Sequence, residues 1–111
     1  MKLIADAAHE PAVATPDGAE RRVLSYGAGL MLVEFRFEAD KASWEHSHPH
    51  EQIGYVVEGE IDFCMAGHEP VRLRQGGSYY VPSGVRHYIK TYAPTVLLDA
   101  FTPMRQDFVT K

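Results

Sequence analysis

The chain has 111 residues, of which 45% are hydrophobic, and a formal net charge of −4. This length fits one domain whose core buries roughly two-thirds of the unfolded surface, so no disulfide is needed, and the single cysteine, Cys64, could form none within the chain. Without a basic cluster the sequence argues against a nucleic-acid partner, and without a signal-peptide core or ~20 consecutive apolar residues it predicts a cytoplasmic protein with no membrane association.

The N-terminal segment differs in composition from the rest of the chain. Its first twenty residues are rich in alanine, proline, aspartate and glycine, which favours an extended arm over a helix. From Arg22 onward, short apolar stretches alternate with turn signals, as in an antiparallel sandwich or barrel. We therefore expect an arm over residues 1–21 and an all-β domain over residues 22–111.

The first strand with a clear period lies between Leu30 and Glu38. One set of alternate residues is apolar and the other is charged, which predicts a strand with one buried face. The apolar set is Met31, Val33, Phe35 and Phe37, and the charged set is Glu34, Arg36 and Glu38.

The next two apolar runs, Ile53 to Val57 and Ile61 to Met65, flank the tripeptide Glu58-Gly59-Glu60. A glycine between two such runs predicts that they pair as a hairpin. Later glycine-containing turns separate further strands, and the tail from Met104 to Val109 could form one helical turn. The later strands span residues 79–81, 85–92 and 95–101 and bring the expected total to about eight.

Three of the six histidines lie within five residues, just before the first of these two runs. On an extended backbone, alternate side chains point the same way, so His46, His48, His50 and Gln52 could converge on one face. Imidazole nitrogens suit divalent zinc, nickel, copper, iron, manganese or cobalt. The alternative is that these histidines decorate a polar surface loop.

A second element far along the chain favours the metal interpretation. Gly76 is followed after five residues by Pro82-Ser83-Gly84 and after two more by His87. With His46-Ser47-His48, Gln52 and Gly59, this stretch resembles the two cupin motifs, HxH(x)3E(x)6G and G(x)5PxG(x)2H. The resemblance implies a single-domain cupin fold, a double-stranded β-helix or jelly-roll barrel, that holds one divalent metal ion on His46, His48, Gln52 and His87.

The chain departs from the cupin pattern at three positions. Asp40 replaces a leading glycine, Thr91 replaces a common asparagine, and Gln52 replaces the carboxylate ligand. A neutral amide makes the metal centre more Lewis acidic and the metal more weakly bound. Glu51 is an alternative ligand, although strand parity points it to the other face.

The remaining histidines are expected to lie outside the ligand set. His50 has the right parity but stands off the motif, so we expect it at the barrel rim or behind the ligands, with metal ligation as the alternative. His9 and His68 lie in the arm and in a turn, where we expect them to be solvated.

The last strand supplies candidates for chemistry beyond metal binding. Asp99 shares parity with Leu97 and Phe101, so it faces the barrel interior if they do, and a carboxyl group there is a general acid/base candidate. Its alternative role is an ion pair at the rim with Arg86 or Lys90. Arg105 could fold back over the barrel mouth and bind a substrate carboxylate, or could be a solvated surface residue.

A narrower resemblance combines these residues. The run His-Ser-His-Pro-His-Glu-Gln and the ending Asp99-x-Phe101-x-Pro103-x-Arg105-x-Asp107-Phe108 look like the KdgF-type cupins of pectin and alginate breakdown. Those enzymes convert 4,5-unsaturated monouronates to the linear keto form. The resemblance implies catalytic roles for Asp99, Phe101 and Arg105, a small carboxylated sugar as substrate, and a metal that acts as a Lewis acid.

Two other functions stay open at this point, because cupins serve many functions on one fold. The chain could be a metal-dependent dioxygenase of a small organic substrate, or a non-catalytic module that binds a sugar or effector. Small cupins often pair by sheet addition, and the arm could supply an edge strand, so we expect a homodimer.

Overall fold

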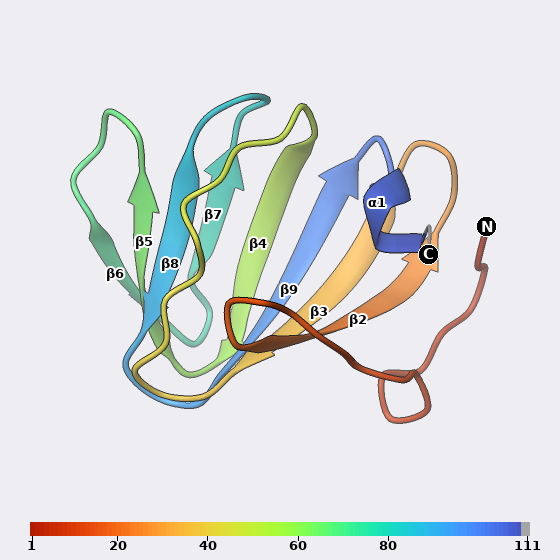
Figure 1. Ribbon diagram of the computed structural model, residues 1–111, viewed down its shortest axis with the longest axis horizontal. Coiled ribbons are helices and arrows are strands. Elements are labelled where there is room, and N and C mark those ends of the chain that lie inside the picture. The colour runs from red at the N-terminus through yellow and green to blue at the C-terminus, as the bar shows by residue number, and fades with distance from the viewer. Residues whose placement is uncertain (110–111) are drawn as a thin grey trace.

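The computed structural model of the protein describes residues 1–109, which form nine strands and one short helix (Figure 1). The strands make two antiparallel sheets, one in the order β1-β2-β3-β9-β4-β7 and the other in the order β6-β5-β8. This all-β barrel confirms the predicted fold class. The elements are β1 (Val13–Ala14), β2 (Ala19–Tyr26), β3 (Met31–Phe37), β4 (Glu51–Glu58), β5 (Glu60–Met65), β6 (Val71–Arg74), β7 (Ser78–Val81), β8 (His87–Thr91), β9 (Thr95–Thr102) and α1 (Gln106–Val109).

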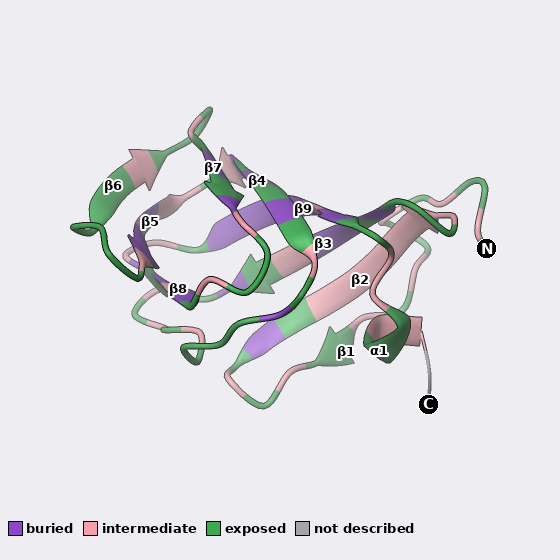
Figure 2. Ribbon diagram, turned by 90° about the horizontal axis from the view of Figure 1, so that it is seen from above, coloured by how far each residue is buried: buried purple, intermediate pink, exposed green. Residues whose placement is uncertain are grey.

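The period of two along β3 places its apolar set inside the barrel as predicted. Met31, Val33 and Phe37 are buried, whereas Leu32 and Arg36 are exposed (Figure 2). The charged set contains one exception: Glu34 is buried, because the arginines at positions 22 and 36 form ion pairs with it on the outer face.

The expected hairpin between the two central runs is wrong. β4 pairs with β7 and β9, whereas β5 pairs with β6 and β8, so the two strands lie in different sheets. Only Gly59 joins them, and one residue is too short for the two-residue loop of a tight hairpin. Gly59 has a φ of +103°, and a Cβ there would overlap Thr95, so this glycine makes the corner between the sheets.

The N-terminal segment contributes to the barrel of its own chain. β1 pairs with β2, and β2 begins at Ala19, inside the segment expected to be an arm. The division of the chain and the homodimer stay predictions. At the other end, α1 packs over the inner face of β3, where the Phe35 and Phe108 rings meet edge to face at 6.2 Å (Figure 1). No helix within residues 1–109 is long and apolar enough to cross a membrane.

Three rows of paired residues run across the inner face of the larger sheet and position the site. The first contains Val33, Asp99, Gly54 and Tyr79, the second Met31, Phe101, Gln52 and Val81, and the third Arg21, Phe35, Leu97 and Val56. Polar groups therefore stand on a face that is otherwise apolar core.

Candidate metal centre and adjoining cavity

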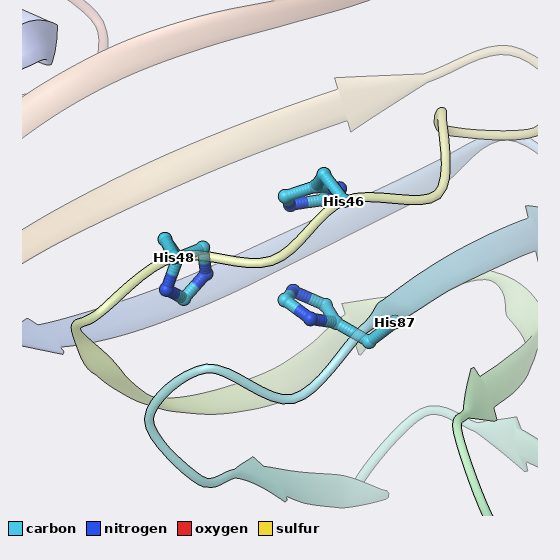
Figure 3. A group of neighbouring side chains, drawn as sticks. All are labelled: His46, His48 and His87. Carbon is cyan, nitrogen blue, oxygen red and sulfur yellow. The ribbon is translucent and has the colours of Figure 1, made fainter.

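Three imidazoles meet at the mouth of the barrel. His46 and His48 lie on the segment before β4, and His87 begins β8 (Figure 3). Reciprocal backbone hydrogen bonds of 3.1 and 2.9 Å between His46 and His87 hold the two segments together. One ring nitrogen from each residue lies within 4.8 Å of the others, so the three side chains could hold one metal ion.

Backbone carbonyls fix the orientation of each ring. Nδ1 of His46 lies 2.7 Å from the carbonyl of Trp44, Nδ1 of His48 lies 3.0 Å from that of His50, and Nδ1 of His87 lies 2.9 Å from that of Val85. A neutral imidazole that donates through Nδ1 presents a lone pair at Nε2. The three rings therefore direct acceptor atoms toward one point.

Burial keeps two of these imidazoles neutral. It lowers the pKa of His87 to about 4 and also lowers the pKa of His48. Nε2 of His87 is buried and has no hydrogen-bond partner among the described residues. An orphaned buried acceptor of this kind is stabilised by a bound cation.

Gln52 adds a fourth donor atom. Its Oε1 lies 3.0 Å from Nε2 of His48, and its side chain also hydrogen-bonds Asp99. Because a carboxylate only accepts, the amide N–H faces Asp99 and the amide oxygen faces the imidazoles. Two lone pairs then face each other across 3.0 Å, an arrangement that a cation relieves. This nitrogen and oxygen donor set fits a divalent metal.

Asp99 is buried inside the barrel, on the face that strand parity predicted. The hydroxyl of Tyr79 donates to its Oδ1 at 2.8 Å. Burial raises the pKa of Asp99 to about 6, although the hydrogen bonds from Gln52 and Tyr79 oppose the shift. The carboxyl therefore changes protonation near neutral pH, as a general acid/base must.

Sequence reasoning missed Tyr79, and Gly54 is the signal that could have found it. Gly54 lies between Asp99 and Tyr79 in the row across the sheet. A Cβ at this position would overlap the Tyr79 ring and Oδ1 of Asp99. A glycine inside a strand often marks such a close approach.

Phe101 and Arg105 also line the cavity. The Phe101 ring meets His48 edge to face at 5.7 Å, and the guanidinium of Arg105 lies 5.3 Å from the Phe101 centroid. Arg105 also lies 4.1 Å from the Phe108 centroid and pairs with Asp107 at 2.8 Å. Its side chain is only 14% exposed, so it is not a solvated surface residue.

These groups surround one cavity of about 260 Å³. Its lining combines apolar and aromatic side chains with polar and charged ones. The apolar and aromatic lining includes Phe35, Phe37, Phe63, Tyr79, Ile89, Leu97 and Phe101, and the other lining side chains include His46, Gln52, His87, Asp99, Arg105 and Arg21.

The other positions singled out in the sequence lie outside this cavity. Glu51 is exposed and accepts a hydrogen bond from Tyr80, so strand parity correctly excluded it from the imidazole group. His50 contributes its backbone carbonyl to the orientation of His48. His9 and His68 are exposed, as expected.

Two departures from the cupin pattern have structural explanations. Asp40 has a φ of +59°, the left-handed region that favours glycine and that aspartate tolerates. Thr91 is buried and donates its hydroxyl to the carbonyl of Glu38 at 2.6 Å, while it accepts from the backbone of Lys41 at 3.0 Å. Neither residue touches the imidazole group.

Comparisons of family, sequence and structure all relate this chain to cupins. A family described as the cupin domain matches residues 33–101. The pectin degradation protein KdgF of Dickeya dadantii is 30% identical over 95 residues, which cover 84% of this chain and 86% of that protein. The solved structure of KdgF from Halomonas sp. has a TM-score of 0.88 and 27% identity, and the match covers 95% of this chain and 98% of that one.

The sequence match to a third relative is local, although the match to its solved structure covers 94% of this chain and 60% of that one, with a TM-score of 0.77 and 26% identity. The dimethylsulfoniopropionate lyase DddQ of Ruegeria pomeroyi is 45% identical over 47 residues, which cover 42% of this chain but 23% of that protein.

Proposed function

This chain belongs to the cupin domain family, and from that premise we propose that it is a KdgF-like, metal-dependent enzyme. Its substrate would be a 4,5-unsaturated monouronate, and its product the linear keto form. The observation that carries the proposal is the buried Asp99 carboxyl, which is hydrogen-bonded to Gln52 beside three convergent imidazoles. A proton carrier and a cation site thus share one small cavity.

The reaction is an isomerisation that moves one proton. The hydroxyl on C1 of the cyclic uronate loses its proton, C1 becomes an aldehyde and its bond to the ring oxygen breaks. The electrons of the resulting enolate then take a proton at C4, and C5 becomes a ketone. Asp99, with a pKa near 6, is suited both to accept the first proton and to donate the second.

A divalent ion held by His46, His48, Gln52 and His87 would supply Lewis acidity at a substrate oxygen. Zinc, nickel, manganese, iron, cobalt or copper fits these donors, and no change of oxidation state is required. Gln52 serves two purposes, since its oxygen faces the imidazoles and its N–H holds Asp99.

Arg105 and Phe101 would position the substrate. Asp107 occupies the Nε and one Nη2 donor of Arg105, so the Nη1 edge of the guanidinium is available to the substrate carboxylate. The Phe101 ring lies between Arg105 and His48, where it would pack against the sugar. The carboxylate would then bind at Arg105, and the C1 hydroxyl would face the imidazoles.

The test is the loss of ultraviolet absorbance as the conjugated double bond of an unsaturated uronate disappears. Metal-loaded wild-type protein should accelerate this loss without consuming oxygen, and Asp99→Ala should abolish it while metal content and fold are retained. Asp6→Ala, at an exposed carboxylate, is the matched control. A wild-type protein that leaves the rate unchanged would refute the assignment.

The local match to DddQ favours a second candidate, a lyase that eliminates dimethyl sulfide from dimethylsulfoniopropionate. Both candidates place a small carboxylate in the same cavity and use a base to move a proton. Release of dimethyl sulfide by the metal-loaded protein, with no effect on unsaturated uronates, would select the lyase. Oxygen uptake with iron would instead indicate a dioxygenase.

A further inference from the structure

One charged side chain in the cavity has no part in the chemistry of the proposed reaction. Arg21 lies in β2, directly opposite Phe35 of β3, and its side chain lines the cavity. It therefore belongs to the inner face of the larger sheet, in the same row as Phe35 and Leu97. A cation on an apolar inner face requires an explanation.

Arg21 and Arg105 contact the same aromatic ring. The guanidinium carbon of Arg21 lies 4.2 Å from the centroid of Phe108, and that of Arg105 lies 4.1 Å from it. The two residues come from β2 and from the segment before α1, so the fold brings them together over the C-terminal helix. Stacking on a ring holds a guanidinium in place while leaving its N–H edges open.

The charges at this end of the cavity do not balance. Asp107 is the carboxylate that acts on both arginines, and Arg105 binds it through two hydrogen bonds of 2.8 and 3.2 Å. Nε of Arg21 is buried and has no hydrogen-bond partner among residues 1–109. Arg21 and Arg105 thus share one neighbouring carboxylate, Asp107, and this local excess of positive charge would be satisfied by a bound anion.

We propose that Arg21 and Arg105 form a two-guanidinium site for the substrate carboxylate, in which Arg21 determines the preference for acidic over neutral sugars. This inference rests on the proposed function, which places the carboxylate at Arg105. Phe101 separates this site from the imidazoles, with contacts to Arg105 on one side and to His48 on the other. A uronate would span the two with its carboxylate on the arginines.

The experiment measures binding of D-galacturonate and D-galactose to zinc-loaded protein by calorimetry. Wild-type protein should bind the acid more tightly than the neutral sugar. Arg21→Gln should weaken galacturonate binding about tenfold, since a charged hydrogen bond is lost, and should leave galactose binding unchanged. Arg21→Lys keeps the charge but loses the planar guanidinium, so its galacturonate affinity should lie between those of wild type and Arg21→Gln. Arg74→Gln removes an exposed arginine from the other sheet and should change neither affinity.

Two results would overturn the inference. One is a galacturonate affinity of Arg21→Gln within twofold of wild type, and the other is a wild-type protein that does not prefer the acid. If the glutamine variant does not fold, Arg21→Lys is measured in its place, and an unchanged acid affinity would again contradict the inference.

Turnover measurements separate this inference from the proposed function. In the turnover of an unsaturated uronate, Arg21→Gln should raise KM about tenfold and leave kcat within twofold, as expected for a group that binds the substrate and its transition state equally. A wild-type protein that turns over the uronate while Arg21→Gln keeps the wild-type KM refutes the arginine site alone. A protein without turnover whose acid preference depends on Arg21 refutes the uronate reaction alone.

Discussion

The two ends of the cavity are built in opposite ways. The imidazole end consists of His46, His48 and His87, and each ring is tied through Nδ1 to a carbonyl two residues away. The arginine end consists of Arg21 and Arg105, which rest on the Phe108 ring. Backbone geometry therefore fixes the neutral end, whereas the charged end depends on how α1 docks.

This difference matches what each end would bind. Neutral nitrogens with open lone pairs suit a cation, and uncompensated guanidiniums suit a carboxylate. Gln52 contacts both Asp99 and His48, so the proposed general acid/base lies beside the proposed metal site. If the two ends are independent, variants at one should leave binding at the other unchanged.

The largest effect is expected from removal of one imidazole. His87→Ala deletes a buried donor and should lower metal affinity by more than about a hundredfold, since even residues behind a ligand contribute 10–100-fold. Zinc titration by calorimetry measures the loss. His68→Ala, at an exposed turn, should bind zinc like wild type. Wild-type zinc affinity in His87→Ala would show that the three rings do not form the metal site.

The imidazole end could be predicted from the sequence because its spacing is local. His46 and His48 stand two residues apart, and the second motif ends at His87 with its turn glycine in place, so the pattern specified both segments. The strand parity of Asp99 was likewise a local property that the structure confirms. Period and motif spacing were sufficient for these positions.

At the arginine end, Arg105 was expected near the barrel mouth, but its neighbour Arg21 could not be predicted in this way. Arg21 and Phe108 lie near opposite ends of the chain, and only the docking of α1 on the inner face brings them together. The wrongly expected hairpin at Gly59 has the same cause, because local pairing signals do not say which sheet a strand joins. The metal ligands and the roles of Asp99, Phe101 and Arg105 stay predictions, which metal titration and turnover assays test.

The second-largest effect is expected when Gln52 is replaced by glutamate. Gln52→Glu should bind zinc about tenfold more tightly, because an anionic ligand replaces a neutral one. It also replaces the N–H that donates to Asp99 with a second carboxylate, which would raise the pKa of Asp99 further. Turnover of the uronate at pH 7 should therefore fall about a hundredfold. Parallel zinc titration and absorbance assays measure both changes, and equal or faster turnover would contradict the role of Asp99.

A smaller effect is expected on the pH dependence of stability in the metal-free protein. The pKa of His87 is lowered to about 4, so its contribution to stability is present above about pH 6.5 and is lost as the pH falls toward 4. The pKa of Asp99 is raised to about 6, so its contribution is present at low pH and is lost as the pH rises through 6. Between pH 7 and 5 the two contributions oppose each other.

Asp99→Asn should remove the pH-dependent contribution of Asp99 to stability and leave that of His87. On going from pH 7 to pH 5, the variant should lose more unfolding free energy than wild type, by on the order of 1–2 kcal/mol. Urea unfolding of chelator-treated protein at both values measures the difference. Identical pH dependence in the two proteins would mean that Asp99 does not titrate in this range.

The smallest effect is expected from the ring that carries both guanidiniums. Phe108→Leu keeps an apolar side chain in the cluster with Phe35 and Phe101 but removes the face on which Arg21 and Arg105 stack. A cation–π contact is worth about 0.5–1 kcal/mol, so galacturonate affinity should fall about threefold. Val109→Ala, which trims the same helix without removing a ring, should not change it.

The zinc affinity of Phe108→Leu tests whether the imidazole end is independent of the arginine end. The imidazoles take their orientation from the carbonyls of Trp44, His50 and Val85, none of which belongs to α1. Zinc should therefore bind Phe108→Leu within twofold of wild type even as galacturonate binding weakens. A parallel loss of zinc affinity would mean that Phe101, which contacts both Phe108 and His48, transmits the change, and that the two ends form one coupled site.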